Sequence, residues 1–98
     1  MVRKLDMYEI HSNKQFRSAY KKLVKSGRFK REEFNKIIDL LEKGEALPPE
    51  YHDHILRGNL SESRECHIAG DTLLIYEVDL INKMVRLTGI GNHAQLFE

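Results

Sequence analysis

The sequence has one cysteine, two prolines and no tryptophan among its 98 residues, and it has no long apolar run. Because Cys66 has no second cysteine to join, the chain can form neither an internal disulfide nor the cysteine pair of a zinc ribbon or finger. No apolar stretch reaches the roughly 18 residues that a membrane span needs, and residues 1–6 are too polar to open a signal peptide. We therefore expect a reduced, cytoplasmic protein without membrane contact.

The remaining composition is that of an ordinary globular domain. Hydrophobic residues make up 41% of the chain and charged residues 32%, unlike disordered or fibrous sequences. A chain of this length has room for one hydrophobic core but not for two. We therefore expect residues 1–98 to form a single domain.

Positive charge is concentrated in the first half of the chain, although the formal net charge is only +1. Residues 1–43 hold twelve Lys and Arg against six Asp and Glu, whereas residues 44–98 hold four against nine. Between Lys14 and Arg31 there are eight basic residues and no acidic one. This pattern indicates a polyanion or an acidic protein as partner, but a solvated lysine-rich helix face has the same composition.

The first half of the chain has a helical period. Residues 7–10 weakly predict a strand, and Ser12, three residues before Gln15, has the spacing of a capping box. The helix predicted to follow has one apolar stripe, formed by Phe16, Ala19, Tyr20, Leu23 and Val24. Its opposite side carries Lys14, Arg17, Lys21, Lys25 and Arg28. Gly27 is expected to end this helix, and a second helix is expected to stop at Gly44.

The second half of the chain has the period of strands. Residues 63–69 alternate and residues 72–78 are nearly continuously apolar, as in a central strand. Residues 84–90 predict the next strand, and residues 54–57 add a short edge strand. The predicted fold is α+β: an N-terminal strand, a helical hairpin, then an antiparallel meander of three to four strands that the helices cover on one face.

The placement of the histidines suggests two kinds of site. His52 and His54 follow the two prolines, His67 lies on a predicted strand, and His93 lies near the C-terminus. Because a meander brings distant strand ends to one edge, three of these side chains can converge. His52 and His54 together with Asp71 or His93 can ligate a metal ion. Two histidines can instead act as base and acid near neutral pH.

Acid–base chemistry suits the cleavage of RNA. One histidine would take the proton of a ribose 2′-OH, and the other would protonate the departing 5′-oxygen. A cation such as Arg64 would neutralise charge on the phosphoryl oxygens, and Asp71 could orient a histidine. Phe97 could stack on an unpaired base. Cys66 alternates onto the same side as Ile68, so we expect a buried thiol rather than a nucleophile.

Four ordered motifs resemble the YafQ-type mRNA interferase toxins of the RelE/ParE superfamily. The motif residues are Leu47-Pro48-Pro49-x-Tyr51-x-Asp53-His54-x-Leu56-x-Gly58, Arg64-Glu65-Cys66-His67-Ile68, Asp71-x-Leu73-Leu74-Ile75-Tyr76, and Thr88-Gly89-x-Gly91-x-His93-Ala94-x-Leu96-Phe97. They span residues 47–97, and the helical region before them resembles the family in pattern only.

The resemblance implies a toxin of a toxin–antitoxin pair that cuts mRNA in the ribosomal A site without a metal or other cofactor. By motif, His54 and His67 match the family's acid–base histidines, Asp71 its aspartate, His93 its C-terminal histidine and Phe97 its aromatic residue. The expected partners are mRNA, the ribosome and an acidic antitoxin.

The basic helix side would then contact RNA through Lys14, Arg17, Lys21 and Lys25. One departure from the family is Thr72, which stands where YafQ has a tryptophan. His11 and His52 match no functional position in the family pattern. The alternatives are a ParE-like toxin that binds DNA gyrase without catalysis and a weakened member that only binds antitoxin.

Overall fold

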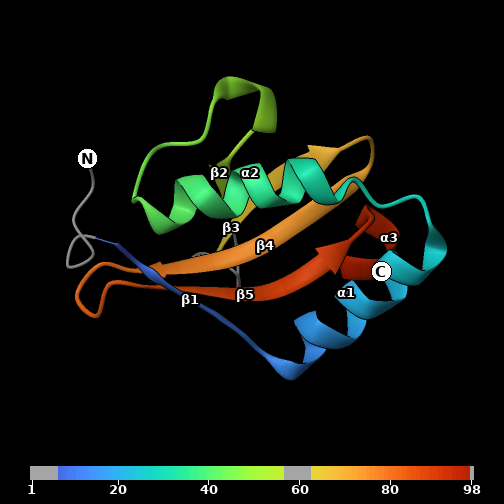
Figure 1. The fold of residues 1–98 in the computed structure, drawn as a ribbon, viewed down its shortest axis with the longest axis horizontal. Helices are drawn as coiled ribbons and strands as arrows, with labels where there is room; N and C mark the ends of the chain where they lie inside the picture. Colours follow the sequence, from blue (N-terminus) through green and yellow to red (C-terminus); the bar gives the residue numbers. More distant parts are fainter. Residues whose placement is uncertain (1–6, 57–62, 98) are drawn as a thin grey trace.

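A computed structural model describes residues 7–56 and 63–97, in which the strands form one mixed sheet in the order β1-β5-β4-β3-β2. Figure 1 shows α2 lying across this sheet and α1 near the end of β5. In chain order the elements are β1 (Glu9–Ser12), α1 (Lys14–Ser26), α2 (Arg31–Glu42), the 3₁₀ turn η2 (Pro49–Tyr51), β2 (His54–Ile55), β3 (Arg64–Ala69), β4 (Thr72–Asp79), β5 (Met84–Gly91) and α3 (His93–Phe97).

The predicted α+β fold is confirmed, including the antiparallel meander of β2 to β5 and the N-terminal strand. The N-terminal strand lies two residues later than predicted and pairs with β5 in parallel, with Ile10 opposite Val85. The edge strand predicted over residues 54–57 is seen at His54–Ile55, and Arg57 lies outside the described residues.

Helix α1 begins one residue later than the capping-box spacing predicts. The N-cap is Asn13, whose side chain accepts a hydrogen bond from the backbone N–H of Phe16 at 2.7 Å. Ser12 is instead the last residue of β1. The predicted helix end is correct, because Gly27 adopts the left-handed conformation with φ of 74°.

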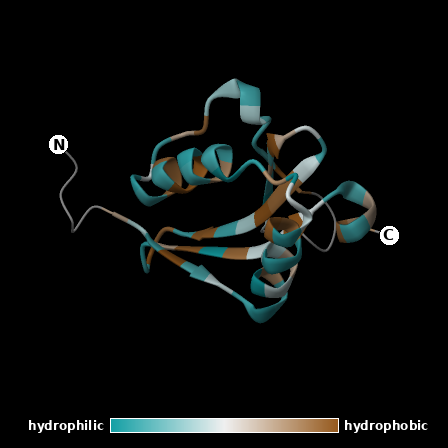
Figure 2. Cartoon of the chain, turned by 45° about the vertical axis from the view of Figure 1, so that its right-hand side comes forward, coloured by the Kyte–Doolittle hydropathy of each residue, from teal (hydrophilic) through white to brown (hydrophobic). Residues whose placement is uncertain are grey.

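The hydrophobic core lies between the sheet and the two long helices. Its buried members are Phe16, Phe34, Ile37, Leu41, Tyr51, Cys66, Ile68, Leu74, Tyr76, Val85, Leu87 and Ile90. Figure 2 shows hydrophobic residues on the facing sides of α2 and the strands. Since burial of one large apolar side chain stabilises by about 1.5–3 kcal/mol, this cluster rather than the short β2 or α3 stabilises the fold.

The opposite face of the sheet has a smaller apolar contact under α3. Leu73 and Ile75 are buried but lie outside the main core, because they alternate with Leu74 and Tyr76 along β4. Leu96 of α3 lies over Gly89, which pairs with Ile75. α3 therefore covers part of the face that α1 and α2 leave open.

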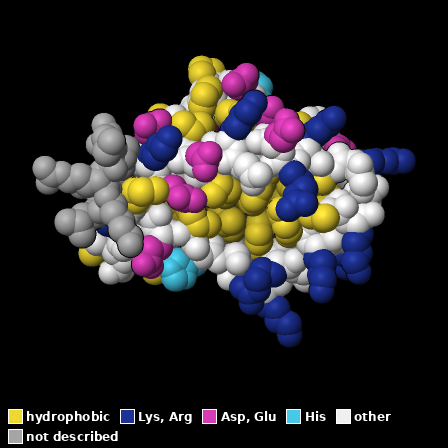
Figure 3. Space-filling model, viewed as in Figure 1, with side chains coloured by type: hydrophobic (Ala, Val, Ile, Leu, Met, Phe, Trp, Pro, Cys, Tyr) yellow, Lys and Arg dark blue, Asp and Glu magenta, His cyan; other side chains and the backbone are white. Residues whose placement is uncertain are grey.

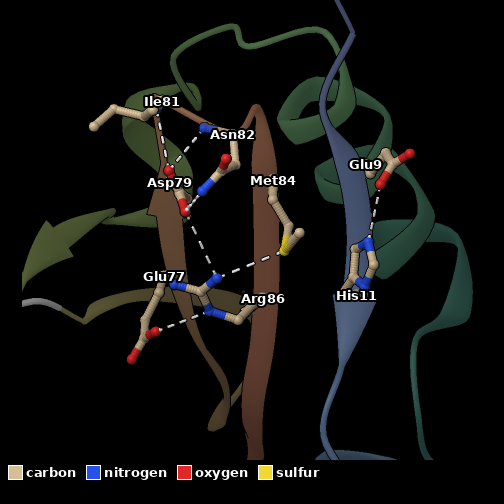
Figure 4. Close-up of polar contacts among 8 residues, drawn as sticks. All are labelled: Glu9, His11, Glu77, Asp79, Ile81, Asn82, Met84 and Arg86. Atoms are coloured by element: carbon tan, nitrogen blue, oxygen red, sulfur yellow. Dashed lines mark hydrogen bonds and ion pairs between the residues drawn. The ribbon is translucent and has the colours of Figure 1, made fainter.

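The hairpin between β4 and β5 is closed by polar contacts far from α3 (Figure 4). The Asp79 carboxylate accepts hydrogen bonds from the backbone N–H groups of Ile81 and Asn82. The backbone and side-chain hydrogen bonds from Asn82 contribute most to lowering the pKa of Asp79. Arg86 joins the two strands through an ion pair with Glu77 at 3.3 Å.

In the described parts of the chain, no helix combines the length and apolar character that crossing a membrane requires.

Candidate active site

Two predicted histidines meet at one carboxylate on the face of the sheet opposite α2. His54 on β2 pairs directly with Glu65 on β3, and His67 lies two residues further along β3 on the same face. One oxygen of Glu65, Oε1, lies 3.4 Å from His54 Nε2 and 3.9 Å from His67 Nε2. The Glu65 side chain is only 10% exposed, whereas His54 and His67 are 50% and 40% exposed. A nearly buried carboxylate therefore lies beside two imidazoles that solvent and a substrate can reach.

A hydrogen bond fixes the tautomer of His54. Its Nδ1 lies 2.7 Å from the backbone carbonyl oxygen of His52. A carbonyl oxygen only accepts, so Nδ1 carries the donated proton. Nε2, the nitrogen nearest Glu65, is then the one that can take up or release a proton.

The segment that carries His52 and His54 is anchored to α2. The buried Tyr51 of η2 donates its hydroxyl to Glu33 at 2.9 Å. Burial and this bond raise the pKa of Tyr51, and the same bond lowers the pKa of Glu33. His52 follows in a left-handed conformation with φ of 49°, and its ring centre lies 5.2 Å from that of His67.

Sequence reasoning missed Glu65 and left His52 without a role, although both lie in this cluster. The available signal for Glu65 was its alternation with His67 on one side of a predicted strand. What the sequence could not supply was the register that sets His54 against Glu65. His11, also without a role, pairs with Glu9 at 3.1 Å on β1, the other edge of the sheet (Figure 4).

His93 stands at the same end of the sheet as His67. Along one row of the sheet, His67 pairs with Leu73 and Leu73 pairs with Gly91, two residues before His93. Two strand spacings separate Gly91 from His67, about 10 Å. The His93 ring packs on Phe97 with ring centres 4.9 Å apart. The structure therefore places His93 and Phe97 together on α3, which follows β5, two strands away from Glu65 and His67 on β3.

Asp71 occupies the turn between β3 and β4 and is exposed. Among the hydrogen bonds and ion pairs of residues 7–56 and 63–97, none joins Asp71 to a histidine. Asp71 instead lines a hollow with Arg28 and Lys30 from the loop between α1 and α2. Its role beside the histidines stays a prediction.

Arg64 lies on the other face of the sheet from His67. It alternates with Glu65, and its guanidinium donates to Asp53 at 2.7 Å. The buried Tyr76 also donates its hydroxyl to Asp53. Bonds to Asp53 raise the pKa of Arg64, and burial raises the pKa of Tyr76. This network lies in the wall of an apolar hollow beside Leu41 and Leu47, so the structure gives Arg64 a structural partner away from the histidines.

The basic residues predicted on the first helix are exposed along α1. Figure 3 shows Lys and Arg side chains gathered at the side of the molecule where α1 lies. The four predicted residues Lys14, Arg17, Lys21 and Lys25 are all exposed. Arg17 also donates to the backbone carbonyl of Ser12, so part of its guanidinium caps the turn into α1.

Metal ligation and thiol chemistry find no support in the geometry. Within the residues that the structure describes, no group of three or more His, Cys, Asp and Glu side chains is arranged to hold a metal ion. Cys66 is fully buried, and this burial raises the pKa of its thiol to about 12. The expectation of a buried, unreactive cysteine is thus consistent with its position in the core.

Small bacterial toxins share this fold. The metal-bound toxin from Helicobacter pylori is 36% identical with a TM-score of 0.85, over 93% of this chain and all 100% of that one. The toxin in the E. coli DinJ–YafQ complex is 28% identical with a TM-score of 0.79, over 93% and 99% of the two chains.

The family is given by the sequence comparisons. A toxin of Haemophilus influenzae named YafQ is 35% identical over 51 residues, which is 50% of this chain and half the length of that relative. The model of the family "Bacterial toxin of type II toxin-antitoxin system, YafQ" matches residues 8–98. The chain belongs to this YafQ family, as the motifs over residues 47–97 predict.

Proposed function

We propose that this protein is a ribosome-dependent endoribonuclease that cuts mRNA in the ribosomal A site and acts as the toxin of a toxin–antitoxin pair. The observation that supports this proposal is the cluster in which Glu65 Oε1 lies within 3.9 Å of both His54 and His67. Two half-exposed imidazoles on one face can serve as base and acid in the same reaction.

The proposed reaction is an attack of a ribose 2′-oxygen on the adjacent phosphorus. One imidazole accepts the 2′-OH proton while the new P–O bond forms, and the bond to the 5′-oxygen breaks. The other imidazole, in its protonated form, donates a proton to that leaving oxygen, giving a 2′,3′-cyclic phosphate and a 5′-OH. Glu65 orients both rings, and the His52 carbonyl leaves His54 Nε2 as the exchanging nitrogen.

The proposed partner outside the ribosome is an acidic antitoxin. The relative in E. coli is seen in a complex with DinJ. In this chain, eight basic residues between Lys14 and Arg31 provide a positive surface for an acidic protein. The same surface can bind RNA, so the antitoxin can inhibit either by covering the histidines or by occupying the basic face.

The test is to map the 5′ ends of a reporter mRNA in a translating extract with purified protein. We expect cuts that follow the reading frame and vanish when ribosomes are omitted. His54→Ala and His67→Ala should each lower cleavage by about 10²–10⁴-fold, whereas His11→Ala, at the opposite edge of the sheet, should leave it unchanged. Losses below about tenfold for both variants would contradict the acid–base assignment.

Two other outcomes would assign a different function. Intact mRNA with continuing translation would favour gyrase binding or a member that only binds antitoxin. Intact mRNA with stalled ribosomes would indicate a protein that blocks translation without cutting.

Removal of metal ions tests the proposed chemistry separately. The H. pylori relative was solved with a bound metal, whereas the mechanism proposed for this chain needs none. EDTA should therefore have no effect beyond the loss of ribosomal magnesium, measured after magnesium is restored to the extract. Activity that returns only on addition of zinc would overturn the metal-independent mechanism.

A further inference from the structure

A continuous groove runs between α1 and α3, on the side of the molecule that carries the basic residues. Its larger part, about 990 Å³, is bounded by α1, by β4 and β5, and by α3. Its smaller part, about 340 Å³, is bounded by the loop after α1, by the turn between β3 and β4, and by the start of α3. Both parts are lined by Leu23, Ser26 and Gln95, so they form one channel, here called the α1–α3 groove.

One wall of the α1–α3 groove is basic. Lys14 and Lys22 line the larger part, and their spacing of eight residues puts them on one side of α1, about 12 Å apart along its axis. Arg28 and Lys30 line the smaller part. Among the salt bridges of the described residues, none involves any of these four side chains. Their charges therefore remain available to an anionic ligand.

The opposite wall offers an aromatic ring and amides. Phe97 is 37% exposed and lines the larger part, while Asn92 and Gln95 line the smaller part. The acidic residues along the groove are Glu77, which is paired with Arg86 at 3.3 Å, and Asp71. Cations along one wall and an aromatic ring on the other are the combination that binds single-stranded nucleic acid without sequence readout.

We propose that the α1–α3 groove binds single-stranded RNA, with Lys22 and Arg28 on its phosphates and Phe97 stacked on a base. This inference rests on the proposed function and specifies how the substrate strand reaches the site. The smaller part of the groove is lined by Asp71 and by Asn92, the residue before His93. Among the basic residues of α1, Lys14 and Lys22 line the groove, whereas the outward basic residues do not.

The test uses neighbouring basic residues as matched controls. Lys21 and Lys22 are adjacent, exposed and equally charged, but only Lys22 lines the groove. Arg28 and Arg31 form a second exposed pair, of which only Arg28 lines the groove. Binding is measured by fluorescence anisotropy with a labelled single-stranded DNA oligonucleotide, which lacks the 2′-OH and cannot be cleaved by the proposed reaction.

We expect Lys22→Ala and Arg28→Ala each to weaken binding about three- to tenfold at low salt and to lower the slope of log Kd against log salt by about 0.7. Lys21→Ala and Arg31→Ala, which lie outside the groove, should each weaken binding less than their groove-lining neighbours, and the exposed Lys43→Ala, outside the basic surface, should leave both quantities unchanged. Phe97→Ala should weaken binding at least about fivefold, and Phe97→Trp should restore it.

Equal losses for Lys21→Ala and Lys22→Ala would overturn the proposal, since binding would then depend only on the overall positive field. A groove that binds a poly-glutamate peptide through Lys22 but does not bind the oligonucleotide would belong to a protein partner instead. Because the probe needs neither ribosomes nor cleavage, these results are independent of the mRNA mapping. Specific binding of the oligonucleotide without mRNA cleavage would support the proposal for the groove and contradict the proposed nuclease activity.

Discussion

Glu65 links the two candidate histidines, because a single oxygen of its carboxylate lies near both rings. Glu65→Gln keeps the size of the side chain and removes its charge. We expect cleavage in the translating extract to fall at least about tenfold, with a changed pH profile, because a protonated imidazole would lose its anionic partner. The exposed Glu45→Gln, away from the cluster, should change neither. An unaltered pH profile for Glu65→Gln would show that Glu65 has only a structural role.

The Cys66 thiol is expected to resist alkylation in the folded protein. Its pKa is raised to about 12 by burial in the core, so the thiolate is scarce at pH 8 and the sulfur is out of reach of reagents. Iodoacetamide labelling, followed by mass spectrometry, should be slow in buffer and fast in denaturant. Rapid labelling in buffer would mean that β3 opens without global unfolding.

The raised thiol pKa also predicts how stability changes with pH. The folded state holds this proton more tightly than the unfolded state, so the stabilisation is fully present below the unfolded pKa of about 8.5 and is lost as pH rises toward about 12. Urea unfolding followed by circular dichroism should show a smaller decline between pH 9 and 11 for Cys66→Ala. An equal decline in both proteins would assign the pH dependence to other groups.

At the scale of elements, the sequence predicts whatever depends on local periodicity. The stripes of α1 and α2, the end of α1 at Gly27 and the central position of β4 follow from apolar spacing. The parallel pairing of β1 with β5 does not, because it depends on where a chain of more than 70 residues returns. The same reason explains why the sequence brought forward His54 and His67 but not Glu65, whose importance comes from its strand partner.

Helix α3 was not predicted from the sequence, although the sequence contains its capping motif. Asn92 accepts a hydrogen bond from the Gln95 backbone N–H, and Gln95 Oε1 accepts one from the Asn92 backbone N–H, both at 2.8 Å. This reciprocal pair is a capping box. With five residues, α3 is too short to show a helical period.

Loss of this cap should loosen α3. Asn92→Ala should lower the free energy of unfolding by about 1 kcal/mol, and Asn92→Ser, which can still cap, should restore most of it. Hydrogen exchange of the backbone amides of α3, read by NMR, should speed up in the alanine variant while that of β4 does not. Unchanged exchange would show that α3 is held by the packing of Leu96 over Gly89 rather than by its cap.

At the scale of the whole molecule, the uneven charge distribution becomes a geometric division of α1. Lys14 and Lys22 line the α1–α3 groove, whereas Arg17 and Lys21 do not. If the outward residues contact ribosomal RNA, as predicted for the basic helix side, they contribute through charge and position without sequence readout. If only the net charge mattered, basic residues on any face of the protein would attract RNA equally.

A charge-matched pair of variants separates position from net charge. Arg17→Glu with Lys21→Glu changes the charge as much as Lys43→Glu with Lys83→Glu, two exposed residues at the C-cap of α2 and in the turn between β4 and β5. We expect only the α1 double variant to weaken cosedimentation with ribosomes. The difference in cosedimentation between the wild type and this variant should shrink as salt rises, because salt screens the contacts that only the wild type makes. Equal weakening by both double variants would mean that the α1 face is merely solvated and that overall charge governs association.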